Sequence, residues 1–140
     1  MILLDTNVIS ELMKPAPDPA VARWVESVSA QTLYLSTITA GELWSGLFNM
    51  ADGKRKASQE AVITELLEED FADLVLPFDI QAARAFGEIY QARRRLNGKK
   101  QELDCLIAAI AKVNNLKLAT RDVQDFEGCG LEIINPWTHR

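Results

Sequence analysis

Short apolar runs alternate with longer helical patterns along the whole chain, and this alternation constrains the fold more than any other feature of the sequence. Short apolar runs bounded by turn residues are typical of buried strands. Strands that alternate with helices indicate a parallel sheet with helices on both faces. The pattern predicts strands at 2–4, 33–35, 74–76, 116–119 and 131–134, and leaves their order in the sheet open. The chain is therefore expected to adopt an α/β fold.

Between these strands, apolar residues recur at helical spacing, and capping residues mark where helices begin. Asp18, followed by Pro19, and Asp79 are typical N-caps. The helix after the second strand begins at Ser36 or Thr39. Helices are expected at 7–12, from 18, from 36 or 39, at 58–70, from 79 to 97–98 and at 103–113. A surface loop is expected at 51–58. The residues expected to point inward from the third and fourth helices are Leu43, Leu47, Phe48, Val62, Leu66 and Leu67.

Length and apolar content indicate one domain that spans residues 1–140. The chain has 140 residues, of which 48% are hydrophobic, so it can bury a core without disulfides or a structural metal. Its two cysteines lack the spacing and the partner histidines of a zinc site. The sequence contains no signal peptide and no apolar run long enough to span a membrane, so a cytoplasmic location without membrane association is expected.

The chain is acidic, with a net charge of -5, which argues against a protein that coats nucleic acid by bulk charge. A nuclease is still compatible with this charge, because bound cations offset carboxylates at its site. Two basic runs interrupt the acidity, and each is either a phosphate-binding surface or a solvated helix face. The runs consist of Lys54, Arg55 and Lys56, and of Arg93, Arg94, Arg95, Lys99 and Lys100.

Two aspartates follow expected strands. Asp5 comes directly after the first strand, and Asp122 follows the strand at 116–119. Because ligands bind at the carboxyl ends of the strands in open α/β sheets, both are candidate site residues. Asp is also common in turns and caps, so position alone leaves a structural role open for each.

Asp104 and Glu42 lie in helices. Asp104 is the only charged residue from Leu103 to Ala111, in an otherwise apolar helix, and burying its charge is costly unless it is paired or binds metal. This favours a ligand or catalytic role over pairing with an arginine or exposure at a helix end. Glu42 lies three residues after Thr39, and this spacing alone favours a capping box in which Thr39 is the N-cap.

Together, the four carboxylates indicate an oxygen-rich site for Mg²⁺ or Mn²⁺. Such a cation relieves the repulsion among the acids, activates water and stabilises charge on a phosphate. Histidine catalysis is not expected, because the single histidine, His139, is next to the C-terminus. Neither a Gly-rich phosphate loop nor a G-x-S-x-G motif is present.

Five segments carry a resemblance to a known family. They are MILLDTNVIS at 1–10, LSTITAGEL at 35–43, DCLIAAIA at 104–111, LATRD at 118–122 followed by Asp125 and Phe126, and NPW at 135–137. In this order, the segments resemble the PIN-domain ribonuclease toxins of the VapC and FitB type, over essentially the whole chain. The charged stretch at 99–103 departs from the family pattern, and Glu102 is either an extra acid or the start of a helix.

The resemblance implies a three-layer α/β/α fold and a metal-dependent endoribonuclease, the toxin of a toxin–antitoxin system. Metal-activated water would cut RNA and leave a 3′-hydroxyl and a 5′-phosphate. The resemblance also implies a homodimer and a cognate antitoxin through which DNA is contacted. The choice of RNA, the antitoxin and the number of metals stay open. By the same resemblance, the catalytic and metal-binding acids are Asp5, Glu42, Asp104 and Asp122. Thr6 and Thr120 are then residues that orient ligands or phosphate.

Three other functions remain as alternatives. One is a PIN-fold binding module without activity, against which the presence of all four acids argues. A haloacid-dehalogenase-type phosphatase also has an Asp after its first strand, but it needs a second Asp at the position of Asn7. A receiver-like domain needs paired acids near the first strand and a downstream lysine, which the sequence lacks.

Overall fold

A parallel sheet forms the centre of the molecule. In the computed structural model, which describes residues 1–97 and 102–140, five strands pair in the order β3-β2-β1-β4-β5. All four pairings are parallel, and Leu4 at the end of β1 lies opposite Ala119 at the end of β4. The strands are β1 (Ile2–Leu4), β2 (Leu33–Ser36), β3 (Val75–Leu76), β4 (Lys117–Ala119) and β5 (Ile133–Ile134). The predicted α/β class is confirmed, with edge strands shorter than expected.

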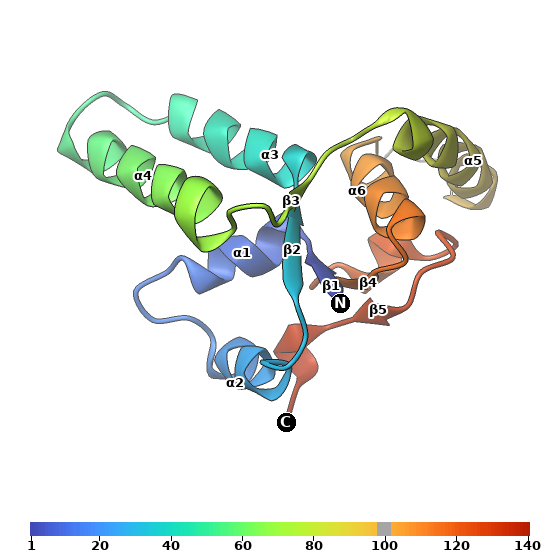
Figure 1. Ribbon diagram of the computed structural model, residues 1–140, viewed down its shortest axis with the longest axis horizontal. Coiled ribbons are helices and arrows are strands. Elements are labelled where there is room, and N and C mark those ends of the chain that lie inside the picture. The colour runs from blue at the N-terminus through green and yellow to red at the C-terminus, as the bar shows by residue number, and fades with distance from the viewer. Residues whose placement is uncertain (98–101) are drawn as a thin grey trace.

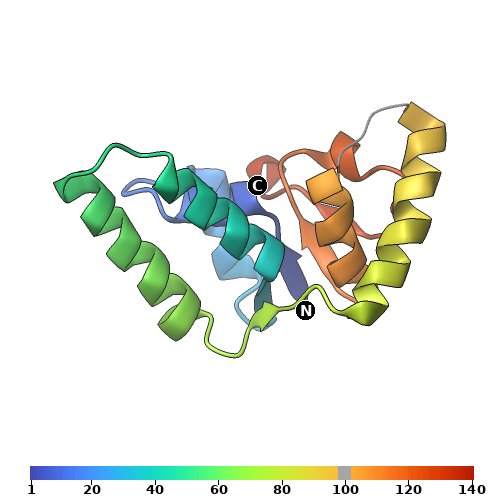
Figure 2. The same cartoon turned by 90° about the horizontal axis from the view of Figure 1, so that it is seen from above.

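Helices cover both faces of this sheet. The longer helices are α1 (Thr6–Leu12), α2 (Pro19–Ser27), α3 (Thr37–Phe48), α4 (Lys54–Glu65), α5 (Ile80–Asn97) and α6 (Glu102–Val113). Short helical turns follow at η1 (Leu66–Asp70), η2 (Val123–Phe126) and η3 (Pro136–Thr138). In Figures 1 and 2, α3 and α4 form a hairpin on one side of the molecule, and α5 packs along α6 on the other. Within the described ranges, no helix has the length and hydropathy to cross a membrane.

The core lies in two parts, one on each face of the sheet. Because successive strand residues point to opposite faces, Leu3 packs against α5 and α6, whereas Ile2 and Leu4 pack against α1 to α4. Ile107 to Ala111 of α6 are all buried, as the apolar sequence predicts. The result is the three-layer α/β/α arrangement.

The α3–α4 hairpin differs from prediction in three respects. The fourth helix begins at Lys54, so the loop expected at 51–58 is mostly helix. Val62 is 43% exposed, because Ile63, one residue later, takes the inward position together with Leu66. Phe48, at the end of α3, is 68% exposed and stacks on Trp44 with a ring centroid distance of 6.2 Å.

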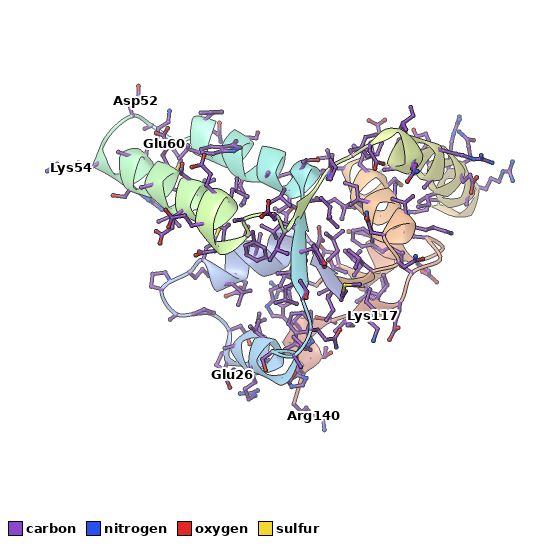
Figure 3. All side chains as sticks on the ribbon, in the orientation of Figure 1. Glu26, Asp52, Lys54, Glu60, Lys117 and Arg140 are labelled. Carbon is purple, nitrogen blue, oxygen red and sulfur yellow. The ribbon has the colours of Figure 1, made fainter. Side chains whose placement is uncertain are left out.

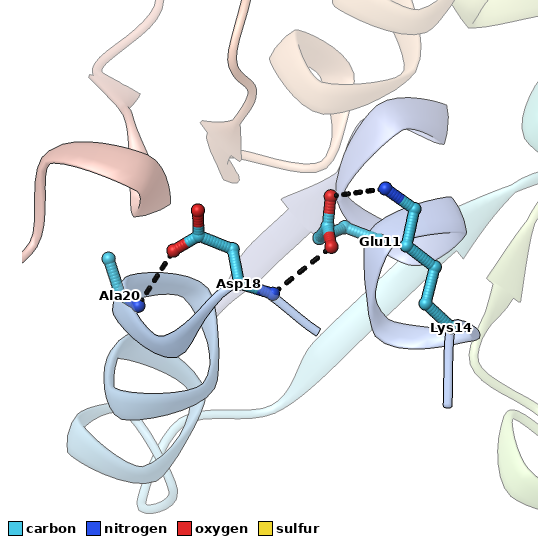
Figure 4. A network of polar contacts seen from close by, with 4 residues as sticks. All are labelled: Glu11, Lys14, Asp18 and Ala20. Carbon is cyan, nitrogen blue, oxygen red and sulfur yellow. Dashed lines mark hydrogen bonds and ion pairs between the residues drawn. The ribbon is translucent and has the colours of Figure 1, made fainter. Parts of the chain in front are cut away.

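A buried glutamate holds the connection between α1 and α2 (Figure 4). Glu11 Oε1 accepts a hydrogen bond from Lys14 Nζ at 2.9 Å, and Oε2 accepts one from the backbone amide of Asp18 at 3.1 Å. Asp18 then caps α2 by accepting from the amide of Ala20, as predicted. The hydrogen bond from Lys14 is the main reason that the pKa of Glu11 is lowered.

Candidate active site

Asp5 and Thr120 meet at the carboxyl edge of the sheet. Each comes directly after its strand, and the pairing of β1 with β4 brings them side by side. Asp5 Oδ2 accepts a hydrogen bond from Thr120 Oγ1 at 2.7 Å, and Oδ1 accepts one from the amide of Thr6 at 2.8 Å. Asp5 is 6% exposed, and this burial raises its pKa although both hydrogen bonds oppose the rise. Asp5 is therefore a fixed, largely desolvated carboxylate.

Asp122 is held at the same edge by Asn7. The Asn7 side-chain amide donates to Asp122 Oδ2 at 3.0 Å, and its Oδ1 accepts from the amide of Arg121 at 3.3 Å. The amide of Asp122 donates to Thr120 Oγ1 at 3.1 Å. Asp122 is exposed at the end of β4, and its carboxylate is directed by these contacts. Its negative charge also contributes to raising the pKa of Asp5.

Glu42 does not belong to a capping box. Ser36 is the N-cap of α3, and its hydroxyl accepts from the amide of Thr39 at 3.1 Å. Thr39 therefore lies inside the helix, and the prediction that Glu42 forms a capping box with Thr39 as the N-cap is wrong. Instead, Glu42 Oε1 accepts from Thr6 Oγ1 at 2.7 Å.

A chain of hydroxyls leads from β2 to Glu42. Ser36 Oγ donates to Thr39 Oγ1 at 3.4 Å, and the hydroxyls of Thr39 and Thr6 lie 2.9 Å apart. Because an ionised carboxylate only accepts, the Thr6 proton is directed to Glu42, so Thr39 is the donor to Thr6. Every hydroxyl in the chain thus donates toward Glu42 and orients its carboxylate.

Asp104 lies in the first turn of α6, half-buried and facing the other acids. Burial, as the largest cause, together with the negative charges of Asp5, Asp125, Glu42 and Asp122, in decreasing order, raises the pKa of Asp104 to about 7. Among the described residues, no arginine or lysine forms an ion pair with Asp104. The alternative in which an arginine neutralises Asp104 is thus not supported in the described part of the chain.

This donor set has the chemistry of a site for a hard divalent cation. All its candidate ligands are carboxylate or hydroxyl oxygens. The raised pKa of Asp104 comes first from burial and then from the neighbouring negative charges, and a bound cation would offset both. Residues 1–97 and 102–140 contain no preassembled group of three His, Cys, Asp or Glu ligands. Mg²⁺ keeps several waters and commonly binds through one or two carboxylates, so the arrangement fits such an ion.

Comparison with known proteins places the chain in a family. A family model described as PIN domain matches residues 2–127. The chain belongs to the PIN-domain family. It is 44% identical to the VapC ribonuclease Y4jK of Sinorhizobium fredii, covering 98% of both chains. It is 39% identical to the toxin FitB of Neisseria gonorrhoeae, covering 98% of this chain and 99% of FitB.

A solved structure of FitAB bound to a DNA fragment, IR36, contains a chain with the same fold. The TM-score is 0.85 at 35% sequence identity, and the match covers 100% of this PIN domain and 98% of that chain. The similarity to the VapC and FitB type is therefore confirmed for both sequence and fold.

The four acids Asp5, Glu42, Asp104 and Asp122 form what we call the acidic edge, and three further polar residues of this PIN domain contribute to it although the sequence did not predict them as site residues. Asn7 and Thr39 orient Asp122 and Glu42, and Asp125 adds a negative charge that acts on Asp104. Asp125 lies in η2, where its amide donates to the carbonyl of Asp122 at 3.0 Å. A signal for each was present, because all three lie within the segments that carry the family resemblance.

The second basic run is divided by the structure of the PIN domain. Arg93 is 2% exposed and donates to the backbone carbonyls of Glu127 at 2.6 Å and Gln124 at 3.5 Å. Arg93 therefore belongs neither to a phosphate-binding surface nor to a solvated helix face, the two alternatives that the sequence left open. Arg94 and Arg95 are exposed at the end of α5. Gly98, Lys99 and Lys100 lie outside the described residues, and Glu102 is the exposed first residue of α6.

Proposed function

We propose that this PIN domain is a divalent-metal-dependent endoribonuclease, the toxin of a toxin–antitoxin pair. The observation that carries the proposal is the convergence of acids from distant parts of the chain on Asp104. Asp5, Glu42 and Asp122 all contribute negative charge that raises the pKa of Asp104. Such mutual repulsion destabilises the folded chain unless a cation offsets it, so selection for folding alone does not account for the cluster.

Mg²⁺ or Mn²⁺ is the proposed cofactor, and Asp5, Glu42, Asp104 and Asp122 are proposed to hold it, one or two of them directly and the others through its bound waters. When bound, a divalent cation offsets the carboxylate charge, activates water and stabilises the negative charge that develops on a scissile phosphate. Asp5 is the most buried of the four, whereas exposed Asp122 lies at the solvent side of the edge.

The residues around the acids act as positioning groups in this proposal. Thr120 holds Asp5, Thr6 holds Glu42, and Asn7 holds Asp122, each by a hydrogen bond from its side chain. Asn7 also occupies the position at which a haloacid-dehalogenase-type phosphatase has its second acid. Asn7 donates a hydrogen bond to Asp122 here, and its carboxamide cannot act as a general acid or base. A nuclease site is therefore favoured over that phosphatase.

The names of the relatives support the proposed substrate and partner. One relative is a VapC ribonuclease, which supports RNA as the substrate, and another is a toxin, FitB. The FitAB assembly on DNA supports a partner protein that acts as antitoxin and carries the DNA contact. The homodimer stays a prediction from the family resemblance.

Cleavage of RNA by purified, antitoxin-free protein tests the proposal. End-labelled RNA is incubated with protein in EDTA, Mg²⁺ or Mn²⁺, beside Asp5→Ala. We expect cleavage that needs metal, disappears in Asp5→Ala and leaves 5′-phosphate and 3′-hydroxyl ends. Absence of cleavage over a broad panel of RNAs would instead favour a PIN-fold binding module without activity.

A further inference from the structure

A groove beside the acidic edge contains the arginine of the first basic run. The groove has a volume of about 350 Å³ and lies between α1, α3 and α4. Thr6 and Glu42, which are hydrogen-bonded to each other at the acidic edge, also line the groove. The groove therefore reaches Glu42, one of the four proposed catalytic acids.

The three residues of this basic run have different surroundings. Arg55 lines the groove, whereas Lys56 forms an ion pair with Asp52 at 3.1 Å. Lys54 is exposed at the outer end of the α3–α4 hairpin, where Figure 3 shows it near Asp52. In the part of the chain that the structure describes, Arg55 makes no hydrogen bond or ion pair with another side chain. Its guanidinium is thus available to an anionic ligand.

The remaining walls of the groove suit a nucleotide. Its apolar floor consists of the half-buried side chain of Met50 and the buried side chains of Leu43, Leu47 and Ile63. Ser10 and Gln59 add polar groups, which have no hydrogen-bond partner among the described residues. Apolar surface binds the faces of unstacked bases, and amide and hydroxyl groups bind their edges.

We propose that this groove binds the RNA nucleotide next to the scissile phosphate, with its phosphate on Arg55 and its base over the apolar floor. The proposal rests on the proposed ribonuclease function. Charge supports RNA as the occupant, because an acidic edge on a chain of net charge -5 repels a phosphate backbone unless a nearby cation binds it. A planar guanidinium binds phosphate by paired, charge-assisted hydrogen bonds.

The test measures binding without cleavage. The antitoxin-free protein is titrated in EDTA against a fluorescein-labelled, mixed-sequence single-stranded RNA, at several salt concentrations. We expect Arg55→Ala to weaken binding by about tenfold and to reduce the slope of log affinity against log salt by about 0.7. Lys54→Ala is the matched control, because it removes the same charge from the same helical turn outside the groove. It should change affinity by less than about twofold.

A steric variant tests the groove itself. A Cβ added at Gly46 on α3 meets no atom within 4 Å, and Gly46 lines the groove, so Gly46→Leu places an apolar side chain in it. Gly87→Leu on α5, which has equally open surroundings, is its control. Gly46→Leu should weaken RNA binding, and Gly87→Leu should not. Thermal melting checks folding, and if Gly46→Leu fails to fold, the Arg55 and Lys54 variants decide the matter.

Equal binding by wild type, Arg55→Ala and Lys54→Ala would overturn the proposal, as would wild-type protein that binds no RNA. Unchanged RNA binding together with loss of a co-expressed antitoxin from Arg55→Ala would assign the groove to a protein partner instead. The outcome is separable from that of the ribonuclease proposal. Metal-dependent cleavage that Arg55→Ala leaves intact refutes only the groove, whereas Arg55-dependent RNA binding without any cleavage refutes only the nuclease.

Discussion

The Thr120 hydroxyl donates a 2.7 Å hydrogen bond to Asp5 Oδ2 and so ties the end of β4 to the end of β1. Thr120 is fully buried, and the same hydroxyl accepts from the amide of Asp122. One side chain therefore positions two of the proposed metal ligands. Hydrogen bonds of this kind orient a ligand and tune its basicity.

Replacement of Thr120 tests this positioning role. Thr120→Val keeps the shape but removes the hydrogen bond, so the pKa of Asp5 should rise further and metal affinity should fall by about tenfold or more. Mn²⁺ affinity and the Mg²⁺ dependence of cleavage are the measurements. Thr120→Ser, which keeps the hydroxyl, should restore most of both. A Val variant with wild-type metal affinity would assign Thr120 to packing alone.

Asp104→Asn tests the electrostatic reading of the acidic edge. The folded-state pKa of Asp104, about 7, lies above the ordinary aspartate value of 3.8, so the metal-free protein loses stability as pH rises from about 4 to 7. Asn removes this loss. In EDTA, Asp104→Asn should melt at a higher temperature than wild type above pH 7, and the gap should shrink toward pH 4.

The same variant should lose RNA cleavage while remaining folded. Added Mg²⁺ should stabilise wild type more than Asp104→Asn, because the wild-type carboxylate is a proposed ligand. If the difference in melting temperature between the two proteins stays constant over the whole pH range, the ionised carboxylate of Asp104 does not destabilise the metal-free fold.

Arg93 and its exposed neighbours should behave in opposite ways. Arg93→Met leaves the carbonyls of Gln124 and Glu127 without their donor and should lower the free energy of unfolding by about 2–4 kcal/mol. Arg94→Glu combined with Arg95→Glu should change it by less than about 0.5 kcal/mol. Urea denaturation measures both. If these exposed arginines bind RNA, the double variant will weaken RNA binding most at low salt.

Glu11 should contribute to the stability of the fold at neutral pH and lose this contribution at acidic pH. Its pKa is lowered by Lys14 and by the amide of Asp18, so its contribution to stability is present above the ordinary glutamate pKa of 4.5 and is lost as pH falls through the lower folded-state pKa. Glu11→Gln should therefore melt at a lower temperature than wild type at pH 7, with a difference that disappears in acid. A difference that persists below pH 3 would indicate a packing effect instead.

Local signals predicted most of the fold because they act within a few residues. Asp18 and Asp79 begin helices as expected, each accepting a hydrogen bond from an amide of the following turn. The start of α4 was missed because Gly53 precedes it and offers no side-chain cap. The strand order could not be predicted, because it depends on which helices cross which face.

The site was predictable to the extent that strand ends converge. Asp5 and Asp122 follow from parallel pairing, whereas the true role of Arg93 depends on carbonyls more than 30 residues away. For Glu42, the spacing from Thr39 favoured a role in a capping box over a role in the site. The actual N-cap of α3 is Ser36, one turn earlier. Contacts between residues that are distant in the sequence produce no local pattern from which they could be predicted.

Binding of Mn²⁺ shows most directly whether these carboxylates hold a divalent cation. Mn²⁺ is titrated by electron paramagnetic resonance into metal-free wild type, Asp104→Asn and the exposed control Glu132→Gln. We predict saturable binding to wild type and to Glu132→Gln that Mg²⁺ displaces, and at least about tenfold weaker binding to Asp104→Asn. Absence of binding to wild type, or equal affinity in all three proteins, would contradict the account.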